Sequence, residues 1–163
     1  ELRRFLAPES VVARTEPQVA VPVDARIGPW VRLVGFDLEP SELRPGTPAR
    51  LRLVYECLQP VPQGWRTFLH LETEAPSAYV NLDHVPAEGS APLQDWQPGE
   101  FVVDEVELLL PQATRTGTHV RLWTGIWQPG QPRPEVTIRR GFAVDHGRIG
   151  ILSATIGRPA QGK

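Results

Sequence analysis

Short segments in which apolar and polar residues alternate, separated by turns, are the feature that most limits what this chain can fold into. The clearest segment runs from Arg50 to Leu58, and one of its faces carries Leu51, Leu53, Tyr55 and Cys57. Alternation with a period of two indicates a strand with one buried face, because successive side chains of a strand point to opposite sides. The 18 prolines and 14 glycines supply turns between such strands. The pattern therefore predicts an all-β fold.

Other segments repeat this pattern along the chain. They span residues 30–38, 65–73, 101–110, 117–128, 135–144 and 148–156. About seven to eight short strands with almost no helical signal predict two packed antiparallel sheets. We expect an immunoglobulin-like β-sandwich, and a jelly-roll-like sandwich is the alternative.

The 163 residues suit one domain flanked by arms. We expect residues 1–28 to form an N-terminal arm or linker, because prolines punctuate them. Residues 29–156 are expected to form the sandwich and residues 157–163 a C-terminal tail. The sequence contains no methionine, so we expect the chain to be a processed or truncated part of a longer protein. No apolar run is long enough to cross a membrane.

Charge, cysteine content and motifs exclude several classes of function. The net charge is −2 and there is no basic aromatic patch, so nucleic acid is not an expected partner. Cys57 is the single cysteine, which excludes an internal disulfide. Motifs of serine hydrolases, phosphate-binding loops, zinc proteases and dinucleotide-binding folds are missing. We therefore expect no independent catalysis and no cofactor, apart from the calcium hypothesis below.

The stretch from Tyr79 to Glu105 gathers the least ordinary polar chemistry of the chain, including Asp83, His84 and Asp104. A histidine beside carboxylates is suited to hold a proton or a metal ion. Asp83 and Asp104 are the candidate Ca²⁺ ligands, because Ca²⁺ accepts irregular shells of oxygen atoms, although no D-x-D-x-D-G motif is present. The alternative is that both carboxylates make turn and backbone hydrogen bonds around a crossover, with His84 packing or bonding locally.

Trp96 stands before a turn formed by Pro98 and Gly99. We interpret Trp96 and Gly99 as structural. The turn leads into the strand at Phe101, and the indole closes one end of the core while its N–H donates to a carbonyl oxygen. Stacking of Trp96 on a sugar is the functional alternative.

One face of the segment 117–128 carries four side chains suited to a ligand: His119, Arg121, Trp123 and Trp127. On a strand the two indoles are expected roughly 13 Å apart, a span that suits a sugar chain. Aromatic rings stack on the C–H faces of sugars, while arginine or histidine donates to hydroxyl groups. The alternative is that the N-terminal arm or the last strand covers both indoles, because monomers seldom leave such an apolar area exposed.

The order of several motifs is similar to that of a group of bacterial domains. The motifs are LVGFDLEPSELRPGTPARLRLVYECLQPV, FLHLE, DHVPAEG, WQPGEFVVDEVELLLP and GTHVRLWTGIWQP. Together they resemble the β-sandwich domains of large uncharacterised bacterial proteins. Many of those domains are soluble C-terminal parts of polytopic membrane proteins similar to glycosyltransferases of the mannosyltransferase type, and others are secreted or lipid-anchored. The resemblance covers about Trp30 to Pro129, and it implies an extracytoplasmic sandwich without an established chemistry.

These observations predict a non-catalytic accessory or interaction module of a larger protein or assembly. We expect it in the periplasm or at the cell surface, anchored through an N-terminal segment that this chain lacks, with a protein partner or a parent membrane protein. One alternative is a carbohydrate-binding module that uses Trp123, Trp127 and Arg121. Another is a structural subunit whose terminal arms exchange strands with its neighbours.

Overall fold

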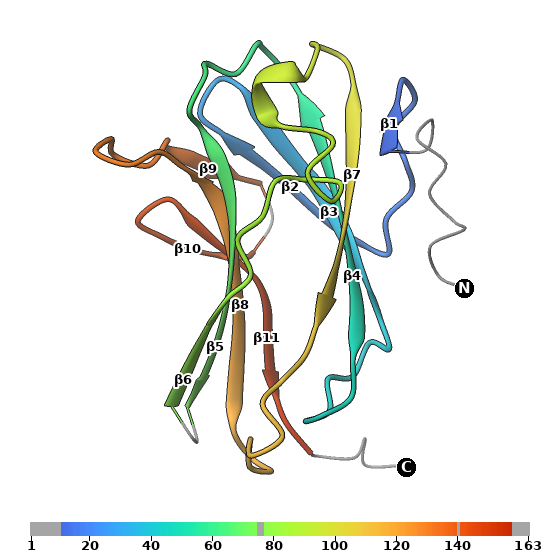
Figure 1. Ribbon diagram of the computed structural model, residues 1–163, viewed down its shortest axis with the longest axis vertical. Helices are drawn as coiled ribbons and strands as arrows, with labels where there is room; N and C mark the ends of the chain where they lie inside the picture. Colours follow the sequence, from blue (N-terminus) through green and yellow to red (C-terminus); the bar gives the residue numbers. More distant parts are fainter. Residues whose placement is uncertain (1–10, 75–76, 140, 158–163) are drawn as a thin grey trace.

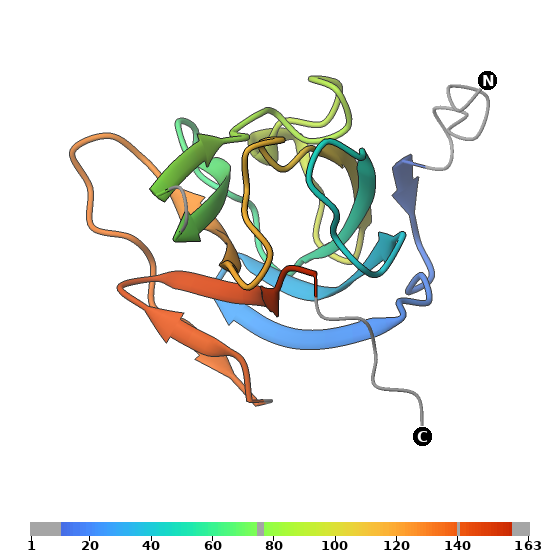
Figure 2. The same ribbon diagram turned by 90° about the horizontal axis from the view of Figure 1, so that it is seen from below.

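The computed structural model describes residues 11–74, 77–139 and 141–157. Within these ranges the chain forms two antiparallel sheets that pack face to face (Figures 1 and 2). The prediction of an all-β, two-sheet sandwich is confirmed.

The first sheet has the strand order β1-β7-β4-β3-β2-β9. Its strands are β1 (Val12–Ala13), β2 (Val21–Ile27), β3 (Val31–Glu39), β4 (Ala49–Cys57), β7 (Phe101–Leu108) and β9 (Val136–Ile138). The second sheet has the order β10-β11-β8-β5-β6. Its strands are β5 (Arg66–Glu74), β6 (Ser77–Asn81), β8 (His119–Trp127), β10 (Ala143–Asp145) and β11 (Arg148–Thr155).

The strand order is that of an immunoglobulin-like sandwich. The row β3-β4-β7 faces the row β11-β8-β5-β6. In the nomenclature of immunoglobulin domains, β3, β4 and β7 correspond to strands A, B and E of one sheet. β11, β8, β5 and β6 correspond to strands G, F, C and C′ of the other. The strand predicted over residues 135–144 is instead two short strands, β9 and β10, which belong to different sheets. The additional strand β1 has two residues, too few for alternation to reveal it in the sequence.

The sandwich begins earlier than the sequence suggested. Residues 12–27, expected to belong to an arm, contain β1 and β2 of the first sheet. β2 buries Val23, Ala25 and Ile27, and its register against β3 shifts between Pro22 and Ala25. Asp24, within this irregularity, has a φ of 52°. Residues 1–10 and 158–163 of the expected arms lie outside the described residues.

The core lies between the sheets and follows the alternation of the long strands. On β8 the inward side chains are fully buried, as predicted; they are Val120, Leu122, Thr124 and Ile126. Burial of each large apolar side chain favours folding by about 1.5–3 kcal/mol, so these layers supply most of the driving force. The opposite face of β8 is the outer face of the second sheet.

Four connections lie toward the end of the sandwich that is uppermost in Figure 1, and the last of them projects to the left just below the other three. They are the β2–β3 turn (28–30), the β4–β5 connection (58–65), the crossover from β6 to β7 (82–100), and the segment that follows β8 (128–135). The crossover contains a short 3₁₀ helix, η2 (Leu93–Asp95), and passes from the second sheet to the first. Loops on a rigid scaffold are where binding residues gather, so this end is a natural place to look for a site.

Gly35 lies at a bulge in β3, where the register against β4 shifts between Leu33 and Gly35. A Cβ atom at this position would lie 2.3 Å from the carbonyl oxygen of Val21 and 2.7 Å from Cγ2 of Val19. Only glycine therefore allows the chain before β3 to pack this closely on it.

We expect Gly35→Ala to lower the free energy of unfolding by about 1–3 kcal/mol, because the added methyl group forces the backbone of β2 away from β3. Urea denaturation measures this change. The matched control is Gly141→Ala, since a Cβ at Gly141 meets nothing within 4 Å. A loss no larger than that of the control would contradict the close approach.

Candidate functional site

The outer face of β8 does not form one binding surface. Of the four predicted side chains, Trp123 is covered, His119 and Arg121 lie toward one end of the strand, and Trp127 lies at the other end.

Trp123 is 5% exposed, because residues of the last strand close over it. Its indole N–H donates to a carboxylate oxygen of Glu72 at 3.1 Å, and the guanidinium of Arg148 lies 4.3 Å from the ring centroid. Arg148 also donates to Glu72 at 3.1 Å. Gly150 packs against the ring edge, where a Cβ atom would lie 3.2 Å from Trp123. Trp123 is therefore not free to bind a ligand, and cover by the last strand, the alternative for this residue, is what the structure shows.

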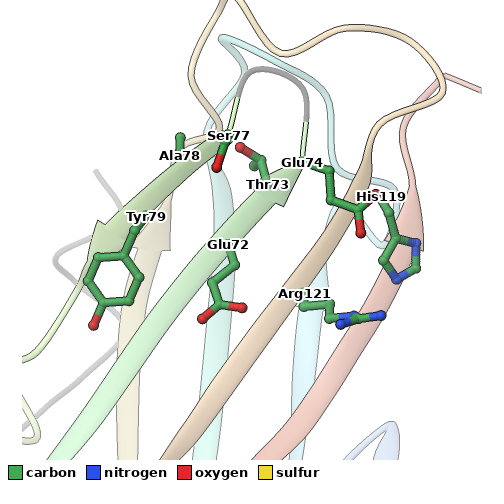
Figure 3. A pocket seen from close by; sticks show the side chains of 8 residues that line it. All are labelled: Glu72, Thr73, Glu74, Ser77, Ala78, Tyr79, His119 and Arg121. Carbon is green, nitrogen blue, oxygen red and sulfur yellow. The ribbon is translucent and has the colours of Figure 1, made fainter.

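His119 and Arg121 line an open pocket of about 410 Å³ on the outer face of the second sheet (Figure 3). The other lining residues come from β5 and β6: Glu72, Thr73, Glu74, Ser77, Ala78 and Tyr79. Tyr79 and Arg121 stand on either side of Glu72 in this view. Carboxylates and a guanidinium both line the pocket, so its charges favour neither an anionic nor a cationic ligand.

Asp83 ties the start of the crossover to β5. Its Oδ1 atom accepts a hydrogen bond from the backbone N–H of Leu69 at 2.8 Å and lies 3.2 Å from Nε2 of His70. The hydroxyl of Thr67 donates to the carbonyl oxygen of His84 at 3.1 Å. The crossover therefore follows the second sheet before it turns toward the first.

Asp104 ties the same crossover to the first sheet. It lies on β7 with a side chain only 1% exposed. One of its carboxylate oxygens accepts from the N–H of Ala87 at 2.9 Å, and the other lies 2.6 Å from Nε2 of His84. A buried carboxylate is costly unless it is paired and hydrogen-bonded, and these contacts satisfy both conditions.

His84 has the geometry of an imidazolium. Its Nδ1 lies 2.7 Å from the carbonyl oxygen of Leu82, while Nε2 faces Asp104. A carbonyl oxygen and an ionised carboxylate are both acceptors, so the ring donates from both nitrogens only when it is protonated. The hydrogen bond to Asp104 is the main reason that the pKa of His84 is raised, and burial opposes it.

The calcium hypothesis gains no support from this arrangement. In residues 11–74, 77–139 and 141–157, no three His, Cys, Asp or Glu side chains come together as a metal-binding group. Asp83 instead accepts from Leu69 of the second sheet, while Asp104, on the first sheet, accepts from Ala87 of the crossover. These hydrogen bonds correspond to the alternative, in which the carboxylates hold the crossover in shape.

Trp96 and Gly99 close the crossover against β4. Trp96 is buried, its N–H donates to the carbonyl oxygen of Ala91 at 2.9 Å, and its ring centroid lies 5.6 Å from that of Tyr55. Gly99 has a φ of 86° and its N–H donates to the carbonyl oxygen of Cys57 at 2.9 Å. The indole therefore belongs to the core and offers no face for a sugar.

Trp127, in contrast, lies half-buried at the end of the sandwich where the four connections lie, together with Trp30 and Trp65. Trp30 directly precedes β3 and Trp65 directly precedes β5. The ring centroids of Trp30 and Trp65 are 5.0 Å apart, with an interplanar angle of 50°. We call this group of three indoles the tryptophan end.

Three adjoining hollows surround the tryptophan end. One of about 560 Å³, here called the Trp65–Trp127 hollow, extends from these two indoles to the crossover. A second of about 520 Å³ is lined by Trp30, Trp65 and residues 131–135. A third of about 750 Å³ is lined by Trp127 and the segment after it. Because neighbouring hollows share an indole, they form one continuous surface of a size typical of ligand sites.

Hydrogen-bonding groups accompany the indoles in the Trp65–Trp127 hollow. Gln63, Arg66 and Gln94 line it and are exposed. Arg66 is the cross-strand partner of Trp127. The indole N–H of Trp127 is buried and has no hydrogen-bond partner within the described part of the chain. This combination suits a ligand with a flat apolar face and oxygen acceptors.

Sequence reasoning placed Trp127 in a site but overlooked Trp30 and Trp65. Both had been assigned to predicted strand segments without a role. The available signal was their position, since each indole of the tryptophan end stands where a strand meets a connection. This position indicates a shared site only when the strand order shows that the three junctions lie at the same end of the sandwich.

Comparison with models of known protein families gives no match, and neither does comparison with curated proteins. Within the described residues, the structure contains no helix of the length and apolar character needed to span a membrane.

The His84–Asp104 pair should make stability depend on pH. Because the pKa of His84 is raised in the folded state, the stabilisation is complete below the unfolded value of about 6.5 and is lost as the pH rises through the raised pKa. We expect His84→Gln to reduce the free energy of unfolding more at about pH 6 than at about pH 9. Urea denaturation of both proteins at the two pH values measures the difference.

Asp104→Asn is the companion variant, because it removes the charged acceptor while keeping the shape of the side chain. It should abolish the pH dependence that distinguishes wild type from His84→Gln. An equal loss at both pH values for His84→Gln would show that folding does not raise the pKa of His84.

Proposed function

We propose that this chain is a non-catalytic carbohydrate-binding module that serves as an accessory domain of a larger protein, and that the tryptophan end is its ligand surface. The observation that carries this proposal is the group of three half-buried indoles around adjoining hollows. The proposed function combines the predicted accessory role with the carbohydrate-binding alternative. It places the ligand at the end of the sandwich and not along the outer face of β8.

Carbohydrate is the ligand class that this chemistry fits. A sugar ring has an apolar C–H face, which an indole covers, and a rim of hydroxyl groups, which amides and a guanidinium bind. Trp65 and Trp127 supply the first kind of contact, while Gln63, Gln94 and Arg66 supply the second. The neighbouring hollows provide room for further sugar units on either side.

We also propose an extracytoplasmic location. The resemblance of residues 30–129 to domains of bacterial membrane-bound and secreted proteins supports it, as does a ligand class that is abundant at cell surfaces. A parent membrane protein would then hold the module close to glycans outside the cytoplasm. No step of this role requires a catalytic residue.

Replacement of the indoles should weaken glycan binding without unfolding the protein. We expect Trp65→Ala and Trp127→Ala each to lower affinity by about tenfold or more, because an aromatic contact contributes on the order of 1 kcal/mol or more. A glycan array identifies ligands, isothermal titration calorimetry measures their affinities, and thermal unfolding verifies each variant.

The matched control is Tyr79→Ala, because Tyr79 is 56% exposed and lies in the separate pocket of the second sheet. It should bind glycans like the wild type. The proposed function is wrong if no glycan binds, or if folded Trp65 and Trp127 variants bind as tightly as the control.

A further inference from the structure

On the basis of the proposed carbohydrate-binding function, we infer that the Trp65–Trp127 hollow binds an acidic sugar, whose carboxylate pairs with Arg66 while its ring lies against Trp127. The inference goes beyond the ligand class and names the charge of the sugar unit. Three features of the lining carry it: an arginine beside an indole, N–H donors at the rim, and acidic groups that already have partners.

Arg66 is the group that selects an anion. It opens β5 directly opposite Trp127 on β8, so the guanidinium and the indole belong to neighbouring positions of the same hollow. Its side chain is exposed, and within the described residues it takes part in no ion pair. A guanidinium presents a planar fork of donors that matches the two oxygens of a carboxylate.

The other charged groups of the lining are satisfied within the protein. Asp83 directs one oxygen to the N–H of Leu69 and to His70. His84 directs both ring nitrogens to acceptors of the protein, one of which is Asp104. Among the charged groups of this lining, Arg66 is therefore the one that has no ion-pair partner within the described residues.

The uncharged groups of the hollow also favour an acceptor-rich ligand. The exposed amide groups of Gln63 and Gln94 supply N–H donors at the rim, beside their own carbonyl oxygens. A carboxylated sugar supplies acceptors on its ring oxygens and its acidic group, and so it complements this set.

The indole of Trp127, beside Arg66, favours an acidic sugar over other anions. In a uronic acid the carboxylate projects from the edge of a ring that has a flat C–H face, so one unit meets Trp127 and Arg66 together. An acidic peptide carries its carboxylates on flexible chains without such a face, and inorganic anions have none. The cross-strand pair Arg66 and Trp127 therefore fits the sugar best.

The test compares sugars that differ only in charge. The probes are oligogalacturonate, oligoglucuronate and oligomannuronate, each beside its methyl ester, with polyglutamate as an acidic chain without sugar rings. We expect at least one uronate to bind about tenfold more tightly than its ester, as one charge-assisted hydrogen bond allows. Its affinity should fall as salt is raised from about 50 to about 500 mM.

The variant Arg66→Gln should bring the affinity of the acid down to that of the ester. It should lower binding of the ester much less, since glutamine still donates hydrogen bonds to hydroxyl groups. Trp127→Phe should weaken both, since it keeps an aromatic face and removes the N–H. Arg115→Gln is the matched control, because Arg115 is exposed and lies in the connection before β8, at the other end of that strand. It should bind both probes like the wild type.

Two failures are distinguishable. If esters and acids bind equally, or Arg66→Gln keeps the preference for the acid, the inference is overturned while the proposed carbohydrate-binding function stands. The same holds if polyglutamate binds as tightly as the best uronate, since the ring would then add nothing. If no oligosaccharide binds in a manner that depends on Trp65 or Trp127, the proposed function falls and the inference falls with it.

Discussion

The contact between His84 and the buried carboxylate of Asp104 is the interaction on which the upper end of the sandwich depends. Asp104 belongs to the first sheet, while the chain before His84 is bound to the second sheet through Asp83. The crossover is therefore held from both sides. Removing one partner of a buried charged pair leaves the other unpaired, which usually costs several kcal/mol. The charged hydrogen bond between His84 and Asp104 thus helps to hold the wall that the crossover gives to the Trp65–Trp127 hollow.

Two kinds of aromatic environment follow from this architecture. On the outer face of the second sheet, Trp123 is sealed by Arg148 and Glu72, so its stacking and hydrogen-bonding capacity is used within the protein. At the tryptophan end the indoles meet connections instead of a further strand, and their faces remain partly open. The site is therefore built where the sheets end and the loops begin, on positions fixed by the strands themselves.

The fold was largely accessible from the sequence because its information is local. Alternation in β4 and β8 identifies strands and inward faces without knowledge of their partners. β2 was missed because Pro22 is typical of a linker, whereas its pairing with Gly35 is a property of the pair of strands. The site was accessible only in part. Trp123 is closed by Arg148, and Trp127 is joined by Trp30 and Trp65, through contacts that strand order alone determines.

The distribution of tryptophan gives this protein a built-in optical probe. The chain has five tryptophans, of which Trp96 and Trp123 are buried while the remaining three form the tryptophan end. Emission from Trp96 reports on the core and emission from Trp123 on the outer face of the second sheet, while the other three report on the polarity around the tryptophan end. Quenching by a soluble reagent reaches these three first. Comparing quenched and unquenched emission therefore distinguishes unfolding from changes at the candidate site without an added label.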